Sequence, residues 1–237
     1  FTPEVIARDK KVMGEYAVAG QFQQRPTPRG GGMFQRQWFT KVNANEVPRG
    51  GKIIRAWDLA ATEASKARSG TAYTVGLKMI MVDEQYYIAD VRRGRWGEKE
   101  VDDQLLDCAK EDGYRVRISL PQDPGQAGKV QAKRFVKLLK GFDVRTSPET
   151  GSKEVRATAL SAQAEAGNVF LVRGFWNEAF LNEICSFPMA AIKDQVDAAS
   201  RAFGDLIGME ERNDDSAAPE AVEPDEEEDE YGLEPLF

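Results

Sequence analysis

Residues 52–59, KIIRAWDL, decide the fold, because their short apolar run predicts a buried β-strand in the middle of the chain. Asp58 stands near the end of this run, directly after Trp57. A carboxylate in a buried strand is costly unless something pairs it, and a metal ion is one such partner. The alternative is an aspartate that caps the strand or bonds the amides of the next loop. Asp58 is therefore the first candidate functional residue.

The residues around this strand alternate between strand and helix patterns. Residues 71–81 and 85–93 are β-branched and aromatic runs separated by a short polar turn, which predicts an antiparallel hairpin. Further strands are predicted at residues 115–120, 143–146 and 169–172, and helices at residues 98–112, 128–139, 153–166, 176–186 and 194–206. Gly113 and Gly208 are the expected stops of two helices. This order predicts an α/β fold, a mixed central sheet flanked by helices on both faces.

Composition divides the chain into three parts. Residues 1–50 are rich in proline and glycine, which predicts a linker with a short helix near residues 4–19 and an apolar segment, 33–39, that packs on the adjoining domain. Residues 51–208 form the predicted domain. Residues 209–237 carry 13 acidic residues and one basic residue, which predicts a disordered tail. Because the chain begins with Phe1 rather than Met, we expect it to be part of a longer protein.

Composition also excludes several kinds of chemistry. The 237 residues include no histidine, which removes histidine-based catalysis and histidine metal ligands. Two cysteines, Cys108 and Cys185, cannot form a zinc site alone and indicate a reducing compartment. No run is long and apolar enough to predict a membrane span. The net charge is −7, but residues 1–208 alone have a net charge of +5, which suits nucleic-acid binding and equally suits an ordinary soluble domain.

Three further aspartates complete a possible carboxylate site. Asp123 follows the strand at residues 115–120 in an Asp-Pro-Gly sequence, which is also an ordinary turn; if this strand neighbours the one at residues 52–59, Asp58 and Asp123 emerge at the same edge. Asp194 and Asp197 share one face at the start of the last helix, where acids also interact favourably with the helix dipole. Together with Asp58 these carboxylates predict a site for Mg²⁺ or Mn²⁺. Two such ions about 3.5–4 Å apart can cleave a phosphodiester bond.

Basic residues near these acids are candidates for contacts to DNA phosphates. The helix beside Asp123 carries several of them, and two more groups follow the hairpin and open a later helix. The candidates are Lys129, Lys133, Arg134, Lys137, Arg92, Arg93, Lys153 and Arg156. Such groups suit sequence-independent binding to the DNA backbone, although a solvated helix face is the alternative for each. The glycines before Lys129 lack the spacing and the hydroxyl residue of an ATP-binding loop.

Five segments in this order resemble the C-terminal nuclease domain of the large terminase subunit of tailed bacteriophages, the DNA-packaging motor. They are YAVAGQFQQRPTPRGGGMFQRQWF (16–39), RAWDLAATE (55–63), PQDPGQAGK (121–129), GSKEVRA (151–157) and KDQVDA (193–198). The resemblance implies a ribonuclease H-like fold. It also implies a Mg²⁺- or Mn²⁺-dependent endonuclease that cuts concatemeric phage DNA during genome packaging with two metal ions.

The resemblance also implies roles for the four aspartates. Asp58 would be the metal ligand of the first strand and Asp123 that of the second. The third ligand would come from the KDQVDA segment, where many relatives have His-Asp-Asp in place of Lys193-Asp194-Gln195. That departure leaves two choices, Asp194 as the ligand, which we favour, or Asp197 supporting or replacing it.

The resemblance implies partners and a location as well. The expected partners are double-stranded DNA, the portal protein, the small terminase subunit and a fused ATPase domain that this chain lacks, with no membrane. The expected location is the cytoplasm of the host bacterium, not the mature virion. Two alternatives stay open: a non-catalytic module that grips DNA and docks on the portal, and another ribonuclease H-like nuclease such as a junction resolvase.

Overall fold

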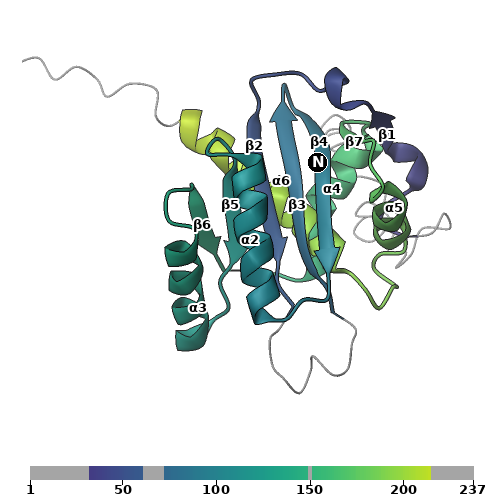
Figure 1. Ribbon diagram of the computed structural model, residues 1–237. Helices are drawn as coiled ribbons and strands as arrows, with labels where there is room; N and C mark the ends of the chain where they lie inside the picture. Colours follow the sequence, from purple (N-terminus) through teal and green to yellow (C-terminus); the bar gives the residue numbers. More distant parts are fainter. Residues whose placement is uncertain (1–31, 61–71, 149–150, 215–237) are drawn as a thin grey trace, which may run out of the picture.

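The computed structural model describes residues 32–60, 72–148 and 151–214, and it shows one mixed sheet with helices on both faces (Figure 1). The predicted helix near residues 4–19, most of the loop at residues 60–70 and the end of the acidic tail lie outside the described residues. Within the described residues, no helix is long and apolar enough to cross a membrane.

The sheet has seven strands in the order β1-β7-β4-β3-β2-β5-β6. Their bounds are β1 (Thr40–Val42), β2 (Lys52–Asp58), β3 (Thr74–Val82), β4 (Gln85–Gly94), β5 (Arg117–Pro121), β6 (Val144–Ser147) and β7 (Val169–Val172). The pairs β2–β3 and β3–β4 are antiparallel, whereas β2–β5, β5–β6, β4–β7 and β1–β7 are parallel. The strand that carries Asp58, β2, therefore lies inside the sheet between β3 and β5.

The helices form two layers that bury opposite faces of β2. They are α2 (Glu98–Asp112), α3 (Gly125–Leu138), α4 (Lys153–Glu165), α5 (Asn177–Cys185) and α6 (Asp194–Asp214), with short 3₁₀ helices at Arg36–Trp38 and Ala44–Glu46. Ile54 and Ala56 belong to the core that α4, α5 and α6 cover, and Trp57 belongs to the core under α2 and α3. Because strand residues alternate between faces, Asp58 falls on the α6 face.

Most predicted elements are confirmed, with boundaries shifted by a few residues. The hairpin turn is the pair Asp83 and Glu84, both with positive φ, as a two-residue turn of type I′ requires. The stop predicted at Gly208 is wrong, because α6 continues to Asp214. A glycine costs a helix only about 1 kcal/mol, and Leu206 and Ile207 pack against the core at this point. The first residues of the predicted acidic tail are therefore helical.

The segment before β2 belongs to the domain rather than to a separate linker. Met33, Phe34 and Phe39 are buried, which confirms the expected packing of residues 33–39. The backbone N–H of Met33 donates to the carbonyl of Phe187 at 2.8 Å. β1 then adds to the edge of the sheet beside β7. The sheet thus begins ahead of residue 51, where composition placed the boundary.

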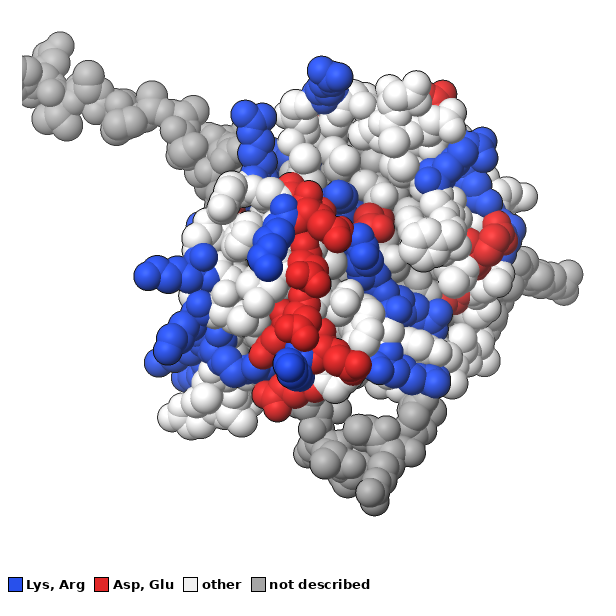
Figure 2. Space-filling view, viewed as in Figure 1, with Lys and Arg blue, Asp and Glu red and all other residues white. Residues whose placement is uncertain are grey.

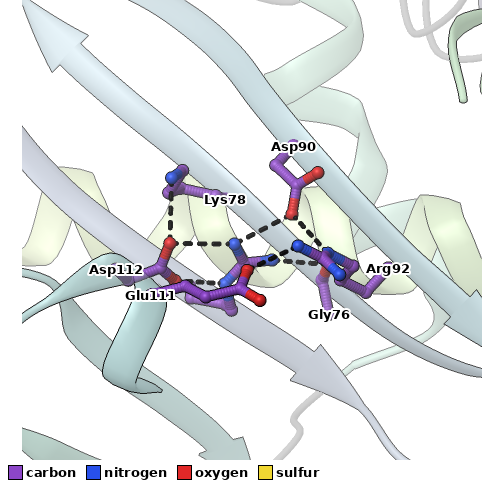
Figure 3. A network of polar contacts seen from close by, with 7 residues as sticks. Gly76, Lys78, Asp90, Arg92, Glu111 and Asp112 are labelled. Carbon is purple, nitrogen blue, oxygen red and sulfur yellow. Dashed lines mark hydrogen bonds and ion pairs between the residues drawn. The ribbon is translucent and has the colours of Figure 1, made fainter. Parts of the chain in front are cut away.

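A buried ion-pair network joins α2 to strands β2, β3 and β4, on the face of the sheet that α2 covers (Figure 3). Its centre is Arg55, whose side chain is 2% exposed and pairs with Asp112, which is 3% exposed. Arg55 also donates from Nη2 to Asp90 at 2.9 Å and from Nη1 to the carbonyl of Gly76 at 3.2 Å. Lys78 Nζ donates to Asp112 at 2.9 Å.

The electrostatics of this network favour the ionised form of Asp112. Burial alone raises the pKa of Asp112, but the hydrogen bonds and charges of Arg55 and Lys78 outweigh burial, so the pKa is lowered from its ordinary 3.8. Arg92 extends the network at its exposed end, pairing with Asp90 at 3.2 Å and Glu111 at 2.5 Å. The network therefore holds α2 on the sheet through charges that satisfy one another.

We predict that Asp112→Asn lowers the free energy of unfolding by about 3–5 kcal/mol, because it leaves the buried Arg55 without its main counter-charge. Urea unfolding measures this loss at neutral pH. The advantage of the wild type is fully present above pH 3.8 and declines as the pH falls through the lowered pKa of folded Asp112. Asp107→Asn, on the exposed side of α2, is the matched control and should cost little. Equal losses in the two variants would contradict the prediction.

Candidate functional site

The pairing of β2 with β5 brings Asp58 and Asp123 to one end of the sheet, where these two strands finish. We call this end the carboxylate edge. The two strands are parallel, and Ala56 lies opposite Ser119. Extending this register by two residues places Asp58 level with Pro121, and Asp123 follows two residues later. The expectation that these strands are neighbours is confirmed. Asp123 is exposed in the turn before α3, and a side chain at Gly128 would collide with the carbonyl of Asp123, so this glycine permits the tight turn.

Asp194 reaches the same edge from the start of α6. Its Oδ2 accepts a hydrogen bond from the backbone N–H of Tyr73 at 2.8 Å. Tyr73 precedes β3, whose Val75 lies opposite Asp58. Burial raises the pKa of Asp194, and the nearby charge of Asp197 adds to this rise, although Tyr73 and Lys153 act against it. Asp194 is thus a half-buried carboxylate that a nearby cation would stabilise.

Asp197 lies one turn further along α6 and is already neutralised by two cations. Its side chain is 3% exposed, and its Oδ2 pairs with the Lys153 ammonium of α4. Its Oδ1 accepts from Arg156 Nη2 at 2.9 Å. Both carboxylate oxygens are therefore engaged by side chains of α4. This arrangement favours Asp194 over Asp197 as the residue available to a metal ion.

Lys153 lies among three of the four predicted carboxylates. Burial lowers its pKa, but the hydrogen bond to Asp197 and the charges of Asp197, Asp58 and Asp194 outweigh burial and raise it. Lys153 therefore stays protonated and supplies positive charge between these acids. The Lys153 ammonium is thus bonded to Asp197 and feels the charges of Asp58 and Asp194, while Asp123 stands at the exposed side of the same edge.

Among the predicted DNA contacts, the arginines are tied to acids of the domain. Arg134 of α3 pairs with Asp102 at 2.6 Å, and Arg92 belongs to the network around Arg55. Arg93 pairs with Glu183 at 3.3 Å and lies over the Tyr73 ring, 3.8 Å from its centroid. These side chains have structural partners in addition to any contact with DNA.

The lysines of α3 differ from these arginines. Lys129, Lys133 and Lys137 are exposed, and none of them forms an ion pair with the described part of the chain. They follow Asp123 on the helix that begins at Gly125. Of the predicted contacts, these three are the best placed to meet a phosphate beside the carboxylates.

The centre of the α2 face of the molecule is unsuited to binding nucleic acid. Figure 2 shows an acidic stripe over α2 with basic side chains on either side of it. α2 contributes the stripe, since seven of its 15 residues are acidic. A polyanion is repelled there. The carboxylate edge and the α6 face are therefore the surfaces to consider.

Glu183 is a residue of this region that the sequence analysis missed. It accepts hydrogen bonds from both the backbone N–H and the side-chain Nε2 of Gln195, each at 2.6 Å. Burial raises the pKa of Glu183, although Gln195 and Arg93 act against this rise. The available signal was an acid on the apolar stripe of α5, beside Phe180 and Ile184. Glu183 fixes the residue next to Asp194, and so helps to set the first turn of α6.

The donors at this edge fit a hard divalent cation by their chemistry. Asp58, Asp123 and Asp194 offer carboxylate oxygens, the ligands that Mg²⁺ and Mn²⁺ prefer, and the buried charge of Asp194 calls for a cation. Within residues 32–60, 72–148 and 151–214, no three acidic or thiol side chains lie close enough to form a ready metal cluster. In this arrangement the Lys153 ammonium balances the acids.

Comparison with solved structures shows the same fold in three phage proteins. The large terminase nuclease from thermophilic phage G20c with bound zinc has a TM-score of 0.51 and 15% identity, over 71% of this chain and 94% of that chain. The nuclease domain of the P22 large terminase has a TM-score of 0.53 and 16% identity, over 78% and 93%. A large terminase from another thermophilic bacteriophage, in complex with ATP-gamma-S, has a TM-score of 0.55 and 16% identity, over 86% and 52%.

The family comparison is independent of these structures. No curated protein matches the chain. Residues 55–205 match the model of the terminase RNaseH-like domain, a span that runs from β2 into α6 and includes Asp58, Asp123, Asp194 and Asp197. The expected ribonuclease H-like fold is confirmed, and the chain belongs to the family of terminase RNaseH-like domains.

Proposed function

We propose that this chain is the DNA endonuclease domain of a viral terminase large subunit, which cuts concatemeric phage DNA during genome packaging. The observation that carries the proposal is the convergence of Asp58, Asp123 and Asp194 at one edge of the sheet in a member of this family. The reaction is hydrolysis of a phosphodiester bond with little sequence preference. We also place this reaction in the cytoplasm of the host bacterium.

The proposed cofactor is Mg²⁺ or Mn²⁺, as two ions held by Asp58, Asp123 and Asp194. Structures of the related G20c nuclease with bound zinc, cobalt and magnesium support a divalent ion. When bound, such ions activate a water molecule and stabilise the departing oxygen of the phosphodiester. The protein contributes the carboxylates and their placement at the end of a rigid strand and a helix.

The residues around these carboxylates position them and the substrate. Asp197, held by Lys153 and Arg156, docks α4 against the start of α6 and so fixes Asp194. The Lys153 side chain is 45% exposed, so its charge also reaches a substrate phosphate and reduces the repulsion between that phosphate and the acids. Lys129, Lys133 and Lys137 bind the DNA backbone beside Asp123.

The proposed partners are those of a packaging motor: double-stranded DNA, a portal protein, a small terminase subunit and an ATPase domain. A second candidate function is a non-catalytic module that grips DNA and docks on the portal. The observation in its favour is that Lys153 already balances Asp58, Asp194 and Asp197. A junction resolvase is the other enzyme candidate, and a preference for branched over linear duplex DNA would identify it.

We predict that the protein nicks and linearises supercoiled plasmid in Mn²⁺ or Mg²⁺ and leaves it intact in EDTA. Asp58→Asn should abolish cutting while DNA affinity stays within a few-fold of wild type, because the residue acts on the reacting phosphate rather than on the DNA backbone. Gel electrophoresis follows the cutting. Asp103→Asn, an exposed acid of α2, is the matched control and should cut normally. Binding without cutting by the folded wild type in every metal would favour the non-catalytic module.

We predict that Asp194 and Asp197, the two acids at the start of α6, have different roles: Asp194 binds the metal ion and Asp197 stabilises the fold. Asp194→Asn should lower Mn²⁺ affinity by at least about tenfold and leave stability nearly unchanged, because an amide still accepts from Tyr73 and burial no longer opposes a charge. Asp197→Asn should lower the free energy of unfolding by about 1–3 kcal/mol, because Lys153 and Arg156 lose the buried carboxylate that they share. Calorimetry and urea unfolding measure the two effects. A stable Asp197→Asn protein without Mn²⁺ binding would instead make Asp197 the ligand.

A further inference from the structure

A basic cavity lies on the α6 face of the sheet, between the β5–β6 edge and the C-terminal half of α6. Its volume is about 600 Å³. Its lining consists of Lys52, Arg117, Arg145, Thr146, Ser147, Asp205 and Met209. Three of these residues are cations, two carry hydroxyl groups and one is an acid. The cavity contains none of the carboxylates of the proposed nuclease site.

The register of the sheet sets the positions of these cations relative to Asp58. Ser119 donates to Asp205 of α6, which shows that this residue of β5 faces α6. Arg145 lies opposite Ser119, and Ser147 lies opposite Pro121, which is level with Asp58. Arg117, two residues before Ser119, lies opposite Ile54. Residues two apart on a strand point to the same face at intervals of about 6.6 Å.

The lining therefore forms an oblique row across β6, β5 and β2, which begins level with Asp58 but two strands away from it. From the level of Asp58 the row passes Ser147, Arg145 and Arg117 and ends at Lys52, the first residue of β2. Along the strand direction, six residues separate the levels of the two ends, a length of about 20 Å. This equals about six steps of one strand of a DNA duplex, at about 3.4 Å per nucleotide.

The side chains of the row are oriented by neighbours that leave hydrogen-bond donors available. Asp143 pairs with Arg117 at 2.7 Å and with Arg145 at 3.4 Å, and a guanidinium has five N–H donors, more than one carboxylate uses. Ser147 accepts from Arg201 Nη1 at 2.8 Å, which leaves the hydroxyl proton of Ser147 to donate. Asp205, the acid of the lining, accepts from Ser119.

We propose that this cavity binds the phosphate groups of a nucleic-acid strand that leads away from the carboxylate site. The inference rests on the proposed function, because its ligand is the same DNA. The ligand class is the phosphodiester backbone, since cations and hydroxyl groups at regular intervals recognise phosphates without reading bases. The α6 face suits this path, whereas the acidic stripe of α2 repels a polyanion from the opposite face (Figure 2).

The acidic residues of the same chain beyond α6 are the other possible occupant of a basic cavity. Met209 lines the cavity, and 10 acidic residues lie between residues 215 and 237. The register favours the nucleic acid, because the row starts at the level of Asp58. The two possible occupants predict different effects of a charge reversal on the affinity for DNA. Reversing a charge in the cavity weakens DNA binding if DNA occupies it, but leaves DNA binding equal or stronger if the acidic residues occupy it.

The test is Arg145→Glu in the whole chain, with Lys110→Glu as the matched control. The two side chains are 70% and 68% exposed, and Lys110 lies on α2. Fluorescence anisotropy with a duplex longer than one helical turn, in EDTA to prevent cutting, gives the affinity over a series of salt concentrations. Arg145→Glu should weaken binding by about tenfold and reduce the slope of log affinity against log salt by about 0.9. Lys110→Glu should change neither by more than about twofold.

Two further measurements separate the possible failures. Arg145→Lys should retain most of the affinity, because it keeps the positive charge, and urea unfolding of Arg145→Glu shows whether its loss of affinity comes from a loss of folding. If the wild type binds and cuts DNA but Arg145→Glu matches Lys110→Glu or binds more tightly, the cavity proposal is wrong and the nuclease proposal stands. If the folded wild type binds no DNA, both proposals are overturned.

Discussion

The buried pair of Arg55 and Asp112 constrains the rest of the domain. A guanidinium inside the sheet is tolerated only when its counter-charge and its hydrogen-bond acceptors are all in place. These partners come from α2, β4 and the carbonyl of Gly76 in β3, so three elements must meet β2 in one register. That same register sets Asp58 opposite Val75, two residues from the Tyr73 amide that holds Asp194. The carboxylate edge on one face thus depends on charges buried under the other.

Much of the fold could be predicted, because periodicity and breakers act locally. The run at β2, the hairpin of β3 and β4 and the helix α2 all follow from patterns within a few residues. β1 could not be predicted, since three residues have no periodicity and pair with β7, far along the chain. The end of α6 was missed because its packing on the sheet outweighs the local cost of Gly208.

The candidate site was only partly accessible from the sequence. The aspartates stand out as acids in or beside apolar elements, and the parallel pairing of β2 with β5 confirms that Asp58 and Asp123 share an edge. The partners of Asp197 lie on α4, more than forty residues away, so their choice depends on tertiary packing. Glu183 was missed for the same reason, because its partner Gln195 belongs to another helix. Local sequence patterns thus identify the candidate acids, whereas their bonding partners depend on contacts between residues that are distant in the sequence.

The contacts at the start of α6 limit which acids remain for metal ions in the proposed nuclease. Gln195 is bound to Glu183 through its backbone N–H and its side-chain amide. Asp197 is neutralised by Lys153 and Arg156. Asp194 is then the one carboxylate of this turn without a cationic side chain bonded to it among the described residues. In the proposed nuclease, two ions would therefore depend on Asp58 and the exposed Asp123 beside Asp194, so the Asp-Pro-Gly turn would matter more than its ordinary sequence indicates.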